Sequence, residues 1–126
     1  MKHPYVLLCL LFCSCATSGS KASHTLGHVL NLANRSADFV ASSDVPVEVK
    51  AEVLLYLEGA VHVLEVAFAA VAEGETFEKV MAITAPAVCL VVLAVEVTSK
   101  HTYVPEYISV ALRVVKALVP GALCGT

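Results

Sequence analysis

Charged residues are scarce in this sequence. They account for 15% of its 126 residues, whereas about 25% is usual for a soluble domain. The eight Lys and Arg residues are scattered along the chain, and the formal net charge is -3. Nucleic-acid binding depends on a patch or stripe of basic residues, so the sequence excludes nucleic acid as a partner.

Recognisable catalytic motifs are also missing. The sequence contains no Gly-x-Ser-x-Gly elbow, no phosphate-binding loop and no pair of cysteines separated by two residues. A chain with so few polar residues has little material for a catalytic site. We therefore expect a protein that is not an enzyme and needs no cofactor.

Apolar side chains, in contrast, are abundant. Hydrophobic residues make up 58% of the chain, compared with about 45–50% in a typical soluble domain. This composition excludes a disordered chain, and the length suits one domain. Three classes remain: a very apolar helical bundle, a membrane protein, and a domain that binds lipid or an apolar partner.

The amino terminus has the three parts of a secretory signal. A basic residue, Lys2, precedes an uninterrupted apolar run at 6–13, and small residues follow at 14–20. The run is too short to cross a bilayer, which takes about 20 apolar residues. We expect residues 1–14 to be a signal peptide and residues 15–23 a flexible linker. The competing interpretation is a buried amino-terminal strand or helix.

Residues 12–15 read Phe-Cys-Ser-Cys, and this segment resembles the lipobox of bacterial lipoproteins. In that family a small residue precedes a cysteine that receives the lipid and becomes the new amino terminus. Ser14 and Cys15 hold these positions, and Phe replaces the usual Leu at the start. The resemblance implies a lipid anchor on Cys15 and, with Ala16 after it, the periplasmic face of the outer membrane. Ordinary cleavage after Ala16 or Ala22 would instead release a soluble secreted protein.

Two cysteines, Cys89 and Cys124, remain after either cleavage. Exported proteins meet an oxidising compartment, so these two residues could form a disulfide. The alternative is that Cys89, which lies in an apolar run, is a buried free thiol that packs as a small hydrophobic residue.

Hydrophobic periodicity predicts the first two helices. Apolar residues recur at spacings of three and four over residues 24–41, and the polar positions of residues 46–73, apart from Lys50, fall on one arc of a helix. We expect Asp44 to cap the second helix, Pro46 to lie in its first turn and Gly74 to close it.

A third helix is predicted over residues 76–97, and it has no charged residue from Val80 to Val95. Pro86 removes a backbone hydrogen bond inside it, so we expect a kink or a split there. The β-branched residues near its end could also form a buried strand, although the segment is too long for one strand. A polar loop at 98–103 leads to a fourth helix, which starts at Pro105 and ends at Pro120.

We therefore predict an all-α fold, a small four-helix bundle over residues 24–120 with a hydrophobic, Pro-kinked third helix at its centre. Residues 121–126 form a tail. Two other placements of segment 80–97 remain open: insertion into a membrane, for which its apolar run is short, and an exposed apolar interface.

Two groups of side chains could bind a metal ion. Glu58, His62 and Glu65 share one face of the second helix, but we expect this face to be solvated, and the other inward-pointing ligands of a metal-binding bundle are missing. His24 and His28 lie four residues apart and could hold a transition metal at an exposed position, but no third ligand lies near them in the sequence. We expect no metal centre.

These observations lead to one expected function and two alternatives. The expected function is that of an exported helical envelope lipoprotein, attached to the membrane by its lipid, that acts as a binding or structural module on another envelope protein. The first alternative is a soluble secreted bundle that binds an apolar ligand. The second is a small membrane protein in which segment 80–97 is inserted.

The lipid-anchor interpretation predicts the mass and the partitioning of the mature protein. Purified from its native host, it should begin at Cys15 with diacylglycerol attached, and it should enter the detergent phase of a cloud-point separation. Cys15→Ser should move it to the aqueous phase. A variant that stays in the detergent phase would exclude the lipid anchor and favour an inserted segment, and a mass that begins at Met1 would exclude export.

Overall fold

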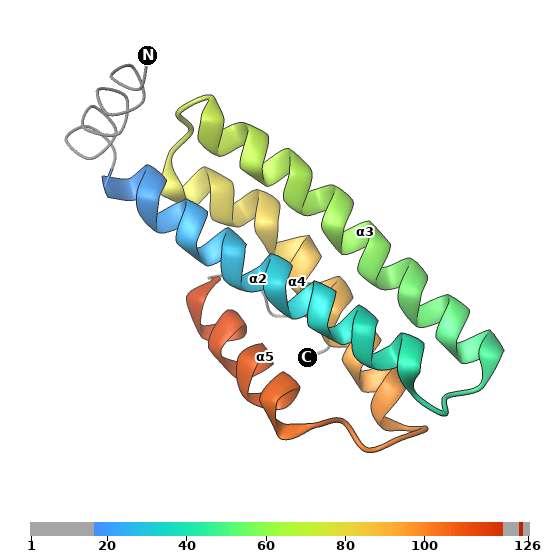
Figure 1. Ribbon diagram of the computed structural model, residues 1–126. Helices are drawn as coiled ribbons and strands as arrows, with labels where there is room; N and C mark the ends of the chain where they lie inside the picture. Colours follow the sequence, from blue (N-terminus) through green and yellow to red (C-terminus); the bar gives the residue numbers. More distant parts are fainter. Residues whose placement is uncertain (1–16, 120–123, 125–126) are drawn as a thin grey trace, which may run out of the picture.

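The computed structural model describes residues 17–119 and 124, and it is a bundle of helices (Figure 1). The helices are α2 (Thr17–Ser42), α3 (Val47–Ala72), α4 (Phe77–Ser99) and α5 (Glu106–Leu118). The described residues contain no strand, so the prediction of an all-α four-helix bundle is confirmed. The predicted signal peptide and Cys15 lie outside the described residues.

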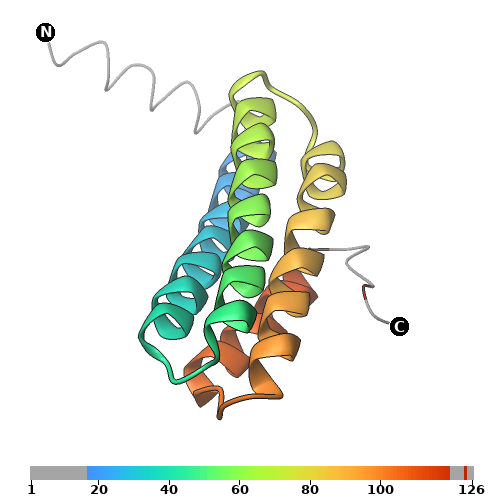
Figure 2. The ribbon, with the colours of Figure 1, turned by 90° about the vertical axis from the view of Figure 1, so that its right-hand side faces the viewer.

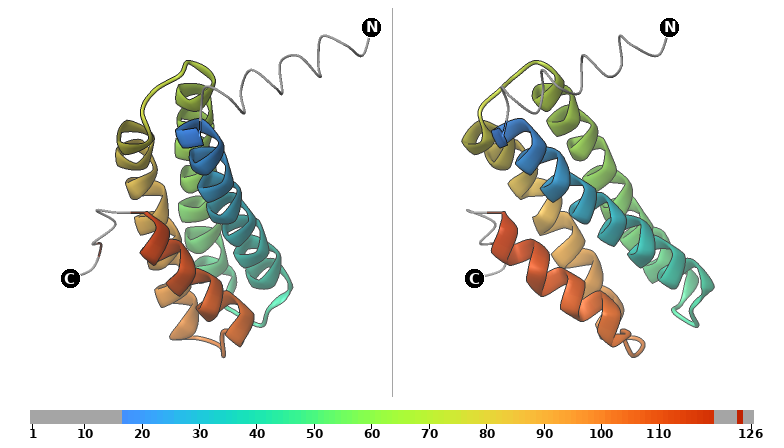
Figure 3. Two further views of the ribbon diagram at one scale, coloured as in Figure 1. Left: turned by 90° about the vertical axis from the view of Figure 1, so that its left-hand side faces the viewer. Right: turned by 60° about the vertical axis from the view of Figure 1, so that its left-hand side comes forward.

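The three long helices run alternately up and down, and the short helix α5 packs on one side of them. Contacts are most extensive between α3 and α4, followed by those between α2 and α3 (Figure 2). Helix α5 lies mainly against α2 and touches α4 only lightly (Figure 3). Each of the four helices therefore buries only part of its circumference.

Small residues allow α3 and α4 to approach each other closely. Ala60 and Ala67 of α3 and Ala87 and Ala94 of α4 are completely buried. A methyl group added at Gly59 would come within 3.3 Å of a side-chain carbon of Leu90. Because the two backbones are close, the larger side chains beside this contact can pack together at the packing density usual for a protein interior.

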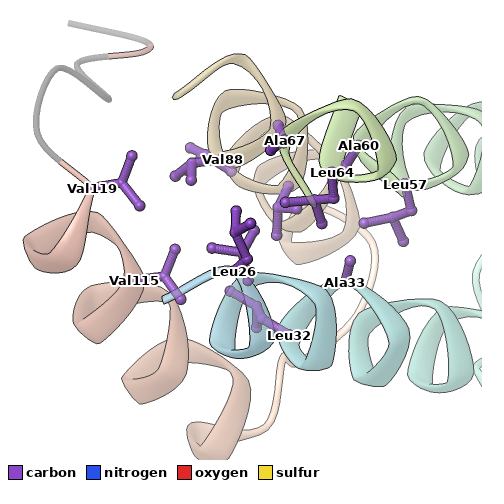
Figure 4. Close-up of a cluster of buried hydrophobic side chains, with 14 of the residues drawn as sticks. Leu26, Leu32, Ala33, Leu57, Ala60, Leu64, Ala67, Val88, Val115 and Val119 are labelled. Atoms are coloured by element: carbon purple, nitrogen blue, oxygen red, sulfur yellow. The ribbon is translucent and has the colours of Figure 1, made fainter. Parts of the chain in front are cut away.

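The core is continuous through the bundle (Figure 4). Leu26 of α2 points toward Leu64 of α3, whereas Leu32 lies on the side of α2 that faces α5 (Figure 4). Leu57 of α3 and Val88 of α4 belong to the same buried cluster. The side of α5 that faces α2 adds further buried side chains, namely Ile108, Val115 and, just beyond the helix, Val119. Burial of such side chains is worth about 1.5–3 kcal/mol each and is the main source of stability here.

The loops show how neighbouring helices are joined. Gly74, with a φ of 83°, turns the chain after α3, and the Thr76 hydroxyl accepts a hydrogen bond from the Lys79 backbone N–H to cap α4.

The prediction that Asp44 caps α3 is wrong, because Pro46 occupies the cap position and no side chain bonds there. Instead, Lys50 Nζ donates to the carbonyls of Ala41 and Ser43, and it thereby satisfies the carboxyl end of α2.

Helix α2 begins earlier than the sequence indicated. It starts at Thr17, so the flexible linker predicted over residues 15–23 is corrected to a helix from residue 17 onward. Ala22 and Thr25 are buried, whereas Lys21 and Ser23 are exposed. The amphipathic pattern therefore extends through these small polar residues, which the sequence analysis took for linker composition.

Pro86 does not divide α4, which is continuous from Phe77 to Ser99. A split at Pro86 is therefore excluded, and the kink, the other form of that expectation, stays a prediction. Two buried hydroxyls in the same helix bond back to the preceding turn: Thr84 donates to the Val80 carbonyl and Thr98 to the Ala94 carbonyl, each at 2.7 Å. These bonds allow polar side chains to lie in an apolar core without an unsatisfied donor.

The core predicts a clear contrast between two leucines of α3. Leu64 is 1% exposed and Leu55 is 65% exposed. Leu64→Ala should lower the free energy of unfolding by about 2–5 kcal/mol because it leaves a cavity, whereas Leu55→Ala should change it by no more than about 0.5 kcal/mol. Urea unfolding followed by circular dichroism measures both. Equal losses in the two variants would contradict the packing described above.

Candidate interaction face

Helix α5 exposes an apolar stripe along its length. Tyr107, Val110, Val114 and Leu118 are 51%, 43%, 45% and 37% exposed, and their spacings of three and four place them on one side of the helix. Ile108 and Val115, further round the same helix, are buried. The apolar arc of α5 is therefore wider than its contact with the bundle, and the uncovered part is called the α5 stripe below.

Polar side chains of α2 border this stripe. The guanidinium carbon of Arg35 lies 5.8 Å from the centre of the Tyr107 ring, within the range of a cation–π contact. At the other end, Leu118 shares an open groove of about 440 Å³ with the first turns of α2; the groove is lined by Ser20, Lys21, His24, Thr25, His28 and Leu118. The two helices run antiparallel, and the stripe follows the boundary between them.

Charge is distributed unevenly between the two sides of the bundle. Helices α2 and α5 together carry four basic and two acidic residues, whereas α3 and α4 carry two basic and six acidic residues. The α5 stripe therefore lies on the basic side of an acidic protein. A partner that covers the stripe would gain by presenting carboxylates around an apolar centre.

The predicted acidic cluster on α3 is exposed to solvent. Glu58, His62 and Glu65 are all exposed, and His62 Nδ1 lies 3.4 Å from Glu65 Oε1 with both side chains 70% exposed. Within the described ranges, no group of three or more His, Cys, Asp or Glu side chains could hold a metal ion. These residues form a solvated face, with one weak histidine–carboxylate contact.

The two histidines of α2 do come together. The ring centroids of His24 and His28 are 5.0 Å apart, and the rings meet edge to face with an angle of 87° between their planes. Both side chains are exposed at the groove beside Leu118. His101 is exposed in the α4–α5 loop.

The interior offers little space for a ligand. A cavity of about 10 Å³ lies between α2, α3, α4 and α5, and its lining includes Ser36, Val53, Thr98 and Ile108. This volume is about enough for a single water molecule and far too small for an acyl chain. Ser36 Oγ is buried there without a protein hydrogen-bond partner, which is a common setting for a bound water.

A tyrosine on α3 has a perturbed pKa. The Tyr56 hydroxyl donates a hydrogen bond of 2.6 Å to Glu52 Oε2. This bond, followed by desolvation and by repulsion from the same carboxylate, raises the pKa of Tyr56 above its ordinary value of 10.0. The pair is on α3, which does not contact α5, and it plays no part in the α5 stripe.

The two central helices are long and apolar. Helices α3 and α4 each satisfy the length and composition of a membrane-crossing helix, although the core helices of soluble bundles satisfy the same criteria. The apolar run in segment 80–97 is short for a membrane span, whereas the complete helix α4 has 23 residues. The charge-free segment is thus part of a helix of sufficient length.

Sequence reasoning did not identify the α5 stripe. The positions of its four residues follow helical spacing, so the signal was present in the sequence. From the sequence, this helix was expected only as a member of the bundle, with its start at Pro105 and its end at Pro120. The missing information was the area of α5 that α2 and α4 are able to cover, and this depends on the packing of the whole bundle.

Comparison with known proteins shows no match to a family model, to a curated protein or to a solved structure. Functional inference for this chain therefore comes from its own residues.

The structure joins Cys89 of α4 to Cys124 in a disulfide, with the two Cα atoms 5.2 Å apart. The two cysteines are 35 residues apart. Helix α5 lies between them in the sequence, so the bond closes a loop that contains α5. A loop of this length is expected to contribute about 3–4 kcal/mol through the restricted unfolded chain.

We therefore expect Cys124→Ser to lower the free energy of unfolding by about 3–4 kcal/mol, as measured by urea unfolding under non-reducing conditions. Addition of a reductant should destabilise the unmodified protein by a similar amount and leave the variant unchanged. Two outcomes would show that the disulfide is absent. One is a thiol titration of the folded protein that detects two free thiols, and the other is a Cys124→Ser variant as stable as the parent.

Proposed function

We propose that this chain is exported and acts outside the cytoplasm as a non-catalytic binding module, held at the cell envelope by a lipid on Cys15. Two independent features support export. The amino terminus carries a basic start, an apolar run and a lipobox-like Cys15, and the folded part carries the Cys89–Cys124 disulfide, a bond typical of oxidising compartments.

The α5 stripe is the observation that carries the binding role. Tyr107, Val110, Val114 and Leu118 are exposed together on one side of α5, whereas α3 and α4 expose large apolar side chains such as Leu55 and Leu93 elsewhere on the bundle. Tyrosine and arginine are enriched among the residues that dominate protein interfaces, and here Arg35 lies against the Tyr107 ring. The stripe therefore has the composition of a protein-binding surface.

The chemistry of the surface defines the partner. An apolar ridge or helix would cover the valines, and carboxylates at its edge would meet Arg35 and the excess basic charge of α2 and α5. We infer that the partner is an envelope protein with an apolar, acid-rimmed contact surface.

A different observation favours a second function. Helices α3 and α4 have the length and composition of membrane spans, as a small membrane protein would require. The bundle instead buries one side of each of these helices in the common core and keeps Glu58, His62 and Glu65 in solvent, which supports the first proposal. The carrier of an apolar ligand has no comparable support, because the interior cavity measures about 10 Å³.

Site-specific photo-crosslinking in the native host tests the binding role. A photoreactive residue at Val110 or Val114 should give one discrete protein adduct, because these positions lie at the centre of the stripe. The same residue at Leu55, an even more exposed position on α3, is the control and should give none. Tyr107→Ala should reduce the Val110 adduct by about tenfold, in line with the loss of a residue that dominates an interface.

Several outcomes would count against the proposal. Adducts of equal yield from Val110 and Leu55 would show that the stripe has no preferred partner. Adducts with phospholipid alone would assign the stripe to the membrane surface. An adduct that is insensitive to Tyr107→Ala would remove the stripe as the contact.

A further inference from the structure

His24 and His28 form a pair of exposed imidazoles on one face of α2. They lie four residues apart, one turn of helix, and their ring centroids are 5.0 Å apart. Two histidines at this spacing on a helix are a recurrent way to present two nitrogen ligands to one metal ion. Neither ring has a carboxylate or other charged partner among the described ion pairs.

The distance between the rings agrees with chelation of one ion. A metal ion lies about 2.0–2.1 Å from each imidazole nitrogen, and hence about 3.2 Å from each ring centre. For angles of about 90–110° at the metal, the two ring centres are then about 4.5–5.2 Å apart. The observed 5.0 Å lies inside this range. Both side chains are exposed, so the rings have room to rotate from their edge-to-face arrangement until one nitrogen of each points at a common ion.

The surroundings determine how such a site would behave. The groove of about 440 Å³ beside the two rings leaves room for further ligands, and its lining includes no carboxylate or thiol. Its one cationic residue, Lys21, places Nζ 4.8 Å from the centre of the Phe77 ring, where the ring face attracts the charge. The remaining coordination positions are therefore open to water or to a donor atom of another molecule.

We propose that His24 and His28 chelate one divalent transition-metal ion of the class Zn²⁺, Ni²⁺ or Cu²⁺ at a labile surface site. Imidazole nitrogen suits these ions, and with two protein ligands the affinity follows the general order in which Cu²⁺ exceeds Ni²⁺ and Zn²⁺. The sequence shows no third ligand near this pair, and for that reason no metal centre was expected; a labile site requires no third protein ligand. The site does not depend on the lipid anchor or on the α5 partner.

Isothermal titration of the purified, disulfide-bonded mature chain with ZnCl₂ and NiCl₂ tests the site. We expect one ion per chain. His24→Gln and His28→Gln should each weaken binding at least tenfold, because each leaves a single imidazole. His62→Gln and His101→Gln are matched controls, exposed histidines elsewhere on the bundle, and they should bind as the parent does.

Circular dichroism verifies that every variant is folded, so a loss of binding is not a loss of structure. A second readout is thermal unfolding, since an ion that binds only the folded chain raises its midpoint. Saturating Zn²⁺ should raise the midpoint of the parent and of His62→Gln but not that of His28→Gln. Binding that survives His24→Gln and His28→Gln, or that is lost equally in His62→Gln, would overturn the proposal.

Discussion

The close contact between α3 and α4 is the constraint on which the rest of the bundle depends. The two helices come close at Gly59, where an added methyl group would lie 3.3 Å from a side-chain carbon of Leu90, and Ala60, Ala67, Ala87 and Ala94 are completely buried. Larger side chains at these positions would add volume to a packed core, which tolerates it poorly. Helix α2 then closes the core over this pair, and α5 covers what α2 and α4 leave open.

Much of this arrangement was predictable from the sequence, because it follows from periodicity. The number of helices, the turn at Gly74 and the solvated face of α3 all result from local patterns. The start of α2 was misjudged, because small polar residues are compatible with both a linker and the exposed side of a helix. Only the burial of Ala22 against the other helices distinguishes the two.

The remaining errors concern features that depend on tertiary contacts. Asp44 is a good capping residue in isolation, but Pro46 holds the cap position of α3, and Lys50 satisfies the nearby carbonyls. Pro86 removes a hydrogen bond locally, yet the packing around α4 keeps the helix continuous. The α5 stripe was missed for a related reason, since a sequence shows that a residue is apolar and not whether a neighbour covers it.

The two candidate contacts, the α5 stripe and the histidine pair, lie on the same side of the molecule. Both belong to α2 and α5, the basic side, whereas the acidic residues concentrate on α3 and α4. The histidine pair shares its groove with Leu118, the last residue of the stripe. A partner lying along the stripe would therefore reach the open coordination positions of the pair.

The Cys89–Cys124 bond has a consequence for the motions of the bundle. Helix α5 contacts only α2 and α4, so it is the element whose detachment exposes the least core and costs the least free energy. The segment that carries α5 is connected to α4 at both ends, at one end by the polypeptide and at the other by the disulfide. A detached α5 would therefore stay close to its position in the bundle. Any opening at this edge would thus uncover Ile108 and Val115 while the disulfide keeps α5 tethered to α4.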